Sequence, residues 1–114
     1  LHEIGHALGL NHPFEDPYII PSGFDFTNYT LMSYTDPENA WWYPYWADSG
    51  SYTISSTPMG YDIAALQHLY GVASHNETDT EYAYDVETPF SEAIWDTAGS
   101  HSLNLGGLST GLRM

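Results

Sequence analysis

The stretch that decides the fold is residues 2–12, which read HEIGHALGLNH. His2 and His6 are four residues apart, so on a helix their imidazoles project from one face about one turn apart. There they can bind a single metal ion, and Glu3 can reach a water molecule on that metal without being a ligand itself. The spacing therefore predicts a helix over residues 1–10 with a metal site on one face.

A third histidine, His12, lies six residues after His6 and three after Gly9. If the helix continued, His12 would point away from the other two histidines, so the chain must turn sharply. Glycine readily takes the positive φ that such a turn requires. Three neutral imidazoles leave a fourth position on zinc open, which is typical of a catalytic site and not of a structural one. The complete pattern argues against the alternative that these histidines are surface or capping residues of an ordinary helix.

The residue types in this pattern predict hydrolytic chemistry. Zinc lowers the pKa of a bound water molecule towards about 7. Glu3 can take the proton as the water attacks a peptide carbonyl, and can then return it to the leaving amine. We therefore expect a zinc-dependent endopeptidase that hydrolyses internal peptide bonds without an acyl-enzyme intermediate.

The composition of the chain restricts its partners and its ligands. Fifteen acidic residues stand against the single base Arg113 in 114 residues, giving a formal net charge of −14. Phosphate binding requires Lys and Arg, so nucleic acid is not an expected partner. There is no cysteine, so zinc must be held by histidine and oxygen ligands. No apolar run approaches the length that spans a bilayer, and we expect no membrane span.

The long histidine motif resembles that of the metzincin clan of zinc endopeptidases. Residues 31–34, which read LMSY, resemble the methionine-containing turn of that clan. The resemblance implies that Met32 forms an apolar floor beneath the three histidines. It also implies that Tyr34 is a catalytic residue, which can ligate zinc and swing away to stabilise the transition state.

Within the clan, the sequence is most similar to the serralysin family of secreted bacterial proteases. The similarity includes His12-Pro13, the methionine turn and residues 61–71, which read YDIAALQHLYG. It implies an α+β fold in which the C-terminal part of a metzincin catalytic domain precedes the start of a β-roll domain. It further implies a secreted protein that acts on protein or peptide substrates, and we expect a monomer.

The domain boundary is predicted near residue 73, with residues 1–73 in the catalytic domain and 74–114 in the β-rich domain. A second helix is predicted from Thr57, as its cap, to Gly71, as its stop, and a short buried strand at residues 93–95. Because the first helix lacks a turn before His2, we expect the natural chain to extend upstream. The Gly/Leu/Ser-rich end similarly suggests a continuation downstream.

The segment after residue 75 resembles the entrance of the serralysin β-roll, where two stretches share a calcium ion. This resemblance implies a possible weak calcium site, but the sequence departs from the family at one point. The family's Gly-Gly-Asn-Asp is replaced by Ala98-Gly99-Ser100-His101. Calcium prefers oxygen ligands, so His101 places calcium binding in doubt. The candidate calcium ligands are Asn76, Thr78, Thr80, Asp96 and Ala98.

Two alternatives stay open at this point. The chain could be a non-catalytic zinc- or calcium-binding module of a secreted adhesion or surface protein, although Glu3 argues against a site that only holds metal. The aromatic run from Trp41 to Trp46 could line a substrate pocket, or it could pack against other parts of the protein. We favour packing, because exposed aromatic clusters are costly.

Overall fold

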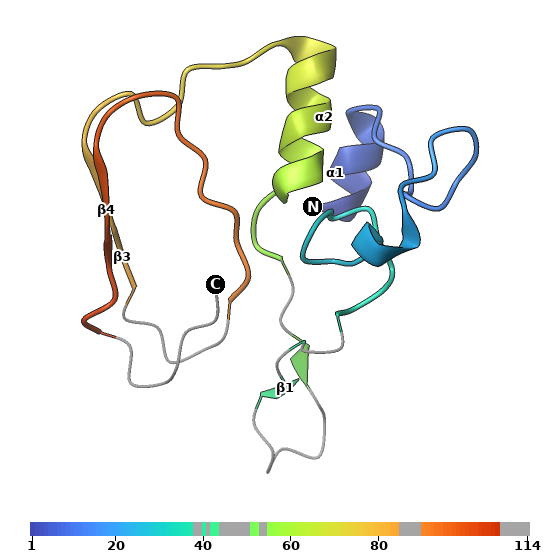
Figure 1. Cartoon of the computed structure of the whole chain (residues 1–114), viewed down its shortest axis with the longest axis horizontal. Helices are drawn as coiled ribbons and strands as arrows, with labels where there is room; N and C mark the ends of the chain where they lie inside the picture. Colours follow the sequence, from blue (N-terminus) through green and yellow to red (C-terminus); the bar gives the residue numbers. More distant parts are fainter. Residues whose placement is uncertain (38–39, 41, 44–50, 53–54, 85–89, 108–114) are drawn as a thin grey trace. The chain divides into compact units, whose positions relative to one another are not determined.

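The computed structural model describes residues 1–37, 40, 42–43, 51–52, 55–84 and 90–107 (Figure 1). The chain divides into two compact units, Leu1–Val72 with Phe90–Ala93, and Ala73–Pro89 with Ile94–Met114. The helices lie in the first unit, and the longer strands lie in the second. The elements are α1 (His2–Ala7), the 3-10 helix η1 (Ser22–Phe24), β1 (Trp42–Tyr43), β2 (Ser51–Tyr52), α2 (Gly60–Tyr70), β3 (Thr80–Ala83) and β4 (His101–Asn104).

Helix α1 is shorter than predicted because a turn closes it after Ala7. Gly9 has a φ of 92°, and its N–H donates to the carbonyl of His6 at 3.0 Å. The N–H of Leu10 donates to the carbonyl of Gly5, also at 3.0 Å. These two bonds form a Schellman motif, which uses a left-handed residue to satisfy the last helical carbonyls. The prediction that Gly9 turns the chain is confirmed.

Helix α2 ends where the sequence predicts but begins later. Gly71, with a φ of 85°, follows its last residue and donates its N–H to the carbonyl of Gln67 at 2.9 Å. The prediction that Thr57 caps this helix is wrong, because the Thr57 hydroxyl accepts a hydrogen bond from the N–H of Ala93 at 2.8 Å. Met59 occupies the capping position.

The core of the first unit lies beneath α1. Met32 is 2 % exposed, and Leu10 and Met59 are also buried. A Cβ added to Gly5 would lie 2.5 Å from the sulfur of Met32, so only glycine lets the helix approach the methionine this closely. Met32 therefore packs against α1, while its role as an apolar floor beneath the three histidines stays a prediction.

The second unit contains one pair of parallel strands among its described residues. Strand β3 pairs with β4 in a register that places Thr80 opposite His101 and Ala83 opposite Asn104. Parallel pairing requires a crossover connection and not a tight hairpin. The predicted strand at residues 93–95 does not form, because the N–H of Ala93 bonds to Thr57 and Ile94 is 47 % exposed.

The aromatic run from Trp41 to Trp46 falls mainly outside the described residues. Of that run, only the backbone of Trp42 and Tyr43 is described, as strand β1 paired antiparallel with β2. Within the part of the chain that the structure describes, no helix is both long and apolar enough to cross a bilayer.

Candidate metal centre

The side chains of His2, His6 and His12, here called the histidine cluster, converge on one point. The Nε2 atom of His12 lies 3.3 Å from Nε2 of His2 and 3.1 Å from Nε2 of His6. In the described part of the chain, these three residues are the one group of metal-ligating type whose ligand atoms lie within 4.8 Å of one another. The α1 spacing and the turn at Gly9 together produce this convergence.

The opposite nitrogen of each ring faces a hydrogen-bond acceptor. Nδ1 of His2 lies 2.7 Å from the carbonyl oxygen of Leu31, and Nδ1 of His6 lies 2.9 Å from that of Leu10. Carbonyl oxygens only accept hydrogen bonds, so each Nδ1 carries a proton and donates it. In a neutral imidazole the other nitrogen then carries a lone pair and no proton.

His12 is oriented in the same way, by a carboxylate in place of a carbonyl. Its Nδ1 lies 2.9 Å from Oε1 of Glu15, and the carboxylate accepts the Nδ1 proton. This hydrogen bond lowers the pKa of the Glu15 carboxyl below its ordinary value. Three Nε2 lone pairs therefore face one another, and their short separations are not hydrogen bonds between neutral rings. Such an arrangement is repulsive unless a cation lies between them.

Zinc fits this donor set. With Zn–N distances of 2.0–2.1 Å, two nitrogens of a tetrahedral zinc site lie about 3.3–3.4 Å apart, close to the 3.1 and 3.3 Å measured between the rings. Zinc-bound histidines usually donate their second N–H to a carbonyl or carboxylate, which fixes the ring and the tautomer. All three rings have such an acceptor.

A buried carboxylate on α2 holds Leu31, the residue whose carbonyl orients His2. Asp62 is 2 % exposed and accepts the Leu31 N–H at 2.7 Å, the Thr30 hydroxyl at 2.6 Å and the Met59 N–H at 2.8 Å. Leu31 in turn accepts the His2 proton on its carbonyl. Helix α2 therefore positions a ring of the histidine cluster although it supplies none of its members.

Tyr34 lies against the histidine cluster. Its hydroxyl oxygen is 2.8 Å from Nε2 of His12. Its ring stacks on His2 with centroids 5.2 Å apart. Phe14 stacks on His12, with ring planes only 6° from parallel. Tyr34 is 68 % exposed, so its phenol borders both the cluster and solvent.

Glu3 is exposed on α1, next in sequence to His2. None of the hydrogen bonds and ion pairs among the described residues involves its carboxylate. A carboxylate without a protein partner can accept a proton from water or substrate, which is what the predicted base requires.

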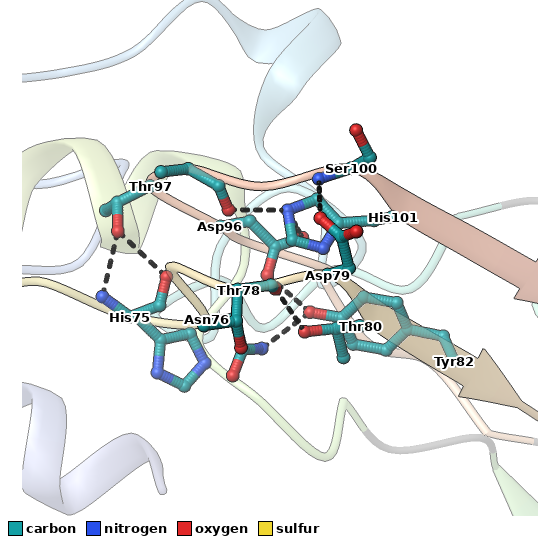
Figure 2. A network of polar contacts seen from close by, with 11 residues as sticks. His75, Asn76, Thr78, Asp79, Thr80, Tyr82, Asp96, Thr97, Ser100 and His101 are labelled. Carbon is teal, nitrogen blue, oxygen red and sulfur yellow. Dashed lines mark hydrogen bonds and ion pairs between the residues drawn. The ribbon is translucent and has the colours of Figure 1, made fainter.

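The residues predicted to bind calcium lie together in the second unit, around the start of β3 and β4 (Figure 2). Tyr82 donates to Oδ1 of Asp96 at 2.5 Å and accepts from the Asn76 amide at 2.7 Å. Nε2 of His101 lies 2.8 Å from the Ala98 carbonyl oxygen. The sequence predicts these residues as separate calcium ligands. In the structure, hydrogen bonds through Tyr82 and His101 involve three of them, Asn76, Asp96 and Ala98.

Four groups that orient the histidine cluster were missed at the sequence level. They are the Leu10 and Leu31 carbonyls and the Asp62 and Glu15 carboxylates. The Leu31 and Asp62 contacts span 29 and 31 residues, so local spacing does not reveal them. Glu15 lies three residues after His12 and could have been found as a nearby acceptor for its ring.

Comparison with curated proteins gives a consistent set of relatives. Serralysin A of Dickeya chrysanthemi is 34% identical over 133 aligned positions, which cover 99% of this chain and 26% of that protein. Metallopeptidase AprA of Pseudomonas marginalis is 33% identical, covering 95% of this chain and 27% of its own length. Serralysin of Proteus mirabilis is 29% identical over 94% of this chain and 25% of its own length.

No protein-family model matches the chain, and no solved structure matches it. The similarity to curated proteins is nevertheless continuous across both units and does not stop at the histidine motif. The predicted resemblance is confirmed: this chain is a serralysin-like sequence, and it spans about a quarter of the length of the metalloproteases that it matches.

Proposed function

We propose that His2, His6 and His12 bind a zinc ion and that this chain supplies the zinc site of a secreted, monomeric endopeptidase. The observation that carries the proposal is the convergence of three Nε2 lone pairs, those of His2 and His6 lying 3.3 and 3.1 Å from that of His12, while every Nδ1 proton is directed to an acceptor. The names of the relatives, which are serralysins and metalloproteases, support the same chemistry.

Zinc bound at the histidine cluster would supply Lewis acidity for hydrolysis of a peptide carbonyl. The chain supplies the proton transfers. Glu3 accepts a proton from the attacking water and delivers it to the departing amine, because its exposed carboxylate has no competing partner among the described residues.

Tyr34 has two proposed roles. Its hydroxyl, 2.8 Å from Nε2 of His12, is near enough to the cluster to serve as a further oxygen ligand. When it turns towards the substrate, the same O–H can donate to the oxygen of the peptide carbonyl as negative charge develops there. The exposure of Tyr34 leaves room for this movement, and the substrates are proteins or peptides.

Replacement of Glu3 by Gln tests the proposal. We expect Glu3→Gln to retain zinc, because Glu3 is not a ligand, and to lose about 10²–10⁴-fold in peptide hydrolysis, the usual contribution of a general base. The measurements are zinc content by elemental analysis and cleavage of a quenched fluorescent peptide. Glu77→Gln, at an exposed position in the second unit, is the matched control for charge.

The outcomes separate the proposal from its alternatives. Hydrolysis that is unchanged in Glu3→Gln would overturn the role of the base. Zinc bound by the unsubstituted protein without any hydrolysis would favour a non-catalytic zinc module. Absence of zinc after purification without chelators would overturn the metal site itself.

A further inference from the structure

The β3–β4 junction consists of the two loops that lead into these parallel strands, residues 75–79 and 96–100, together with Thr80, Tyr82 and His101. Several hydrogen bonds connect the loops. The N–H and carbonyl of His75 both bond to Thr97, at 2.8–3.0 Å. The N–H of Ser100 donates to Oδ1 of Asp79 at 2.9 Å. The connections run directly from one loop to the other (Figure 2).

Three oxygens of the predicted calcium ligands already accept hydrogen bonds from the protein. The Thr78 carbonyl accepts the Thr80 hydroxyl at 2.9 Å, and the Ala98 carbonyl accepts from His101 at 2.8 Å. Oδ1 of Asp96 accepts the Tyr82 hydroxyl. Asn76 directs its amide nitrogen, and not its oxygen, towards Tyr82. Calcium takes six to eight oxygen ligands, and this set does not fit it.

The N–H of His101 disfavours a calcium ion at this place electrostatically. A carbonyl oxygen cannot donate, so Nε2 of His101 must carry the proton of its bond to Ala98. The same N–H lies 3.7 Å from Oδ2 of Asp96. An electropositive N–H therefore lies between two of the predicted calcium ligands. The side chains of Asp96 and His101 are only 14% and 21% exposed. Solvent therefore only partly screens the repulsion between this N–H and a calcium ion beside it.

We propose that the β3–β4 junction is closed by this side-chain network in place of a calcium ion, with the imidazole N–H of His101 standing at the position of the cation. Tyr82 and His101 then stabilise the Asp96 carboxylate together, Tyr82 through a donated hydrogen bond and His101 through the dipole of its N–H. The pKa of the Asp96 carboxyl is lowered by the hydrogen bond from Tyr82, which agrees with a carboxylate stabilised by protein donors.

The backbone supports the same arrangement. Gly99 has a φ of 101°, and a Cβ at this position would lie 2.8 Å from the carbonyl carbon and oxygen of Thr78. The two loops are thus in direct backbone contact. The close approach and the hydrogen bonds together leave the junction held by its own atoms.

The test is a calcium titration of the full chain, depleted of calcium on a chelating resin and kept at constant zinc. Amide signals of Thr97 and Ser100 are followed by two-dimensional NMR. We expect no shift of these signals up to several millimolar calcium in the unsubstituted protein. We expect His101→Asp, which replaces the N–H by oxygen, to gain calcium-dependent shifts at the same amides. His68→Asp, on the exposed surface of α2, makes the same change of charge and should gain none.

Calcium-dependent shifts at Thr97 and Ser100 in the unsubstituted protein would overturn the proposal. So would a folded His101→Asp variant that stays insensitive to calcium. If that variant does not fold, His101→Ala provides the second test. Loss of one hydrogen bond should speed hydrogen exchange of the Ser100 amide by roughly 2- to 10-fold, and unchanged exchange would contradict a clamping role for His101.

Discussion

The histidine cluster of the first unit and the β3–β4 junction of the second are both concentrations of histidine and oxygen groups, but their hydrogen bonding differs. In the cluster, the ring nitrogens that converge carry no protons, so they repel one another. In the junction, the Thr78 and Ala98 carbonyls and Oδ1 of Asp96 each have a protein N–H or O–H directed at them. The first arrangement offers its lone pairs to a cation, and the second supplies its own donors. The direction of the protons, more than the residue types, distinguishes a metal site from a polar network.

The largest expected effect comes from removing a member of the histidine cluster. His6→Ala should weaken zinc binding by about 4 kcal/mol, or roughly a thousandfold, if the ligands share a binding free energy of about 10–16 kcal/mol. Competition with a chromophoric chelator measures the affinity. His68→Ala, which removes an exposed histidine of α2, should leave it unchanged. Equal zinc affinities in the two variants would contradict zinc binding by the histidine cluster and remove its contrast with the junction.

The next largest effect is expected at Asp62, which helps to orient the cluster although it is not a member of it. Asp62→Asn replaces a buried acceptor of three hydrogen bonds by a group that must direct an amide N–H towards donors. We expect a loss of about 2–3 kcal/mol in the free energy of unfolding, measured with urea. Asp36→Asn is the matched control, because that exposed carboxylate accepts only a hydroxyl of Thr27 in the described structure. A loss no greater than in the control would show that Asp62 is not a structural anchor.

A smaller effect is expected from the one side-chain acceptor of the cluster. Glu15→Gln keeps an oxygen near Nδ1 of His12 but removes the negative charge. Loss of an outer-shell partner typically costs 10- to 100-fold in metal affinity, and retention of the oxygen places the expected loss near the lower limit, about tenfold. Glu3→Gln removes the same charge from a residue that orients no ring and should retain its affinity. Identical affinities would show that the Glu15 charge does not contribute.

The smallest effect lies within the junction. Tyr82→Phe removes the hydroxyl that donates to Asp96, so the pKa of that carboxyl should rise towards its ordinary value. A carboxyl with a depressed pKa stabilises the folded state above its unfolded pKa, and this contribution is lost as pH falls through the folded pKa. Carboxyl NMR titration measures the shift, with Tyr61→Phe in the first unit as control. An unchanged or lower Asp96 pKa would contradict the proposed stabilisation of the carboxylate by Tyr82.

The histidine cluster was accessible from sequence because its geometry is local. Helical spacing relates His2 to His6, and one glycine turn brings His12 back, so the spacing within residues 2–12 is enough to predict the cluster. The sequence therefore identified the right three neighbours, while their role as zinc ligands stays a prediction. The resemblance also implies a methionine floor; Met32 is buried close to Gly5 of α1, and its role beneath a metal stays a prediction.

Other features depend on contacts that spacing does not encode. Thr57 has the side chain of a helix cap, but a hydrogen bond from Ala93, 36 residues away, engages it, and α2 begins later. Residues 93–95 have the composition of a strand, yet they find no strand partner. Asp62 could be recognised as an acidic residue in the first turn of a helix, but its bond to Leu31 arises only when the loop folds back over α2.

Hydrogen bonds link helix α2 to the region of the first helix near both ends of α2. At one end, Asp62 accepts the N–H of Leu31, whose carbonyl accepts from His2. At the other end, the Tyr70 hydroxyl donates to the Leu8 carbonyl at 2.8 Å. Zinc at the histidine cluster would bind only the chain folded in this way. By mass action, such a ligand adds RT ln(1 + [L]/Kd) to the free energy of unfolding. The expected consequence is reciprocal linkage: bound zinc would stabilise the packed position of α2, and a substitution that loosens α2 would weaken zinc binding, although α2 supplies none of the three histidines.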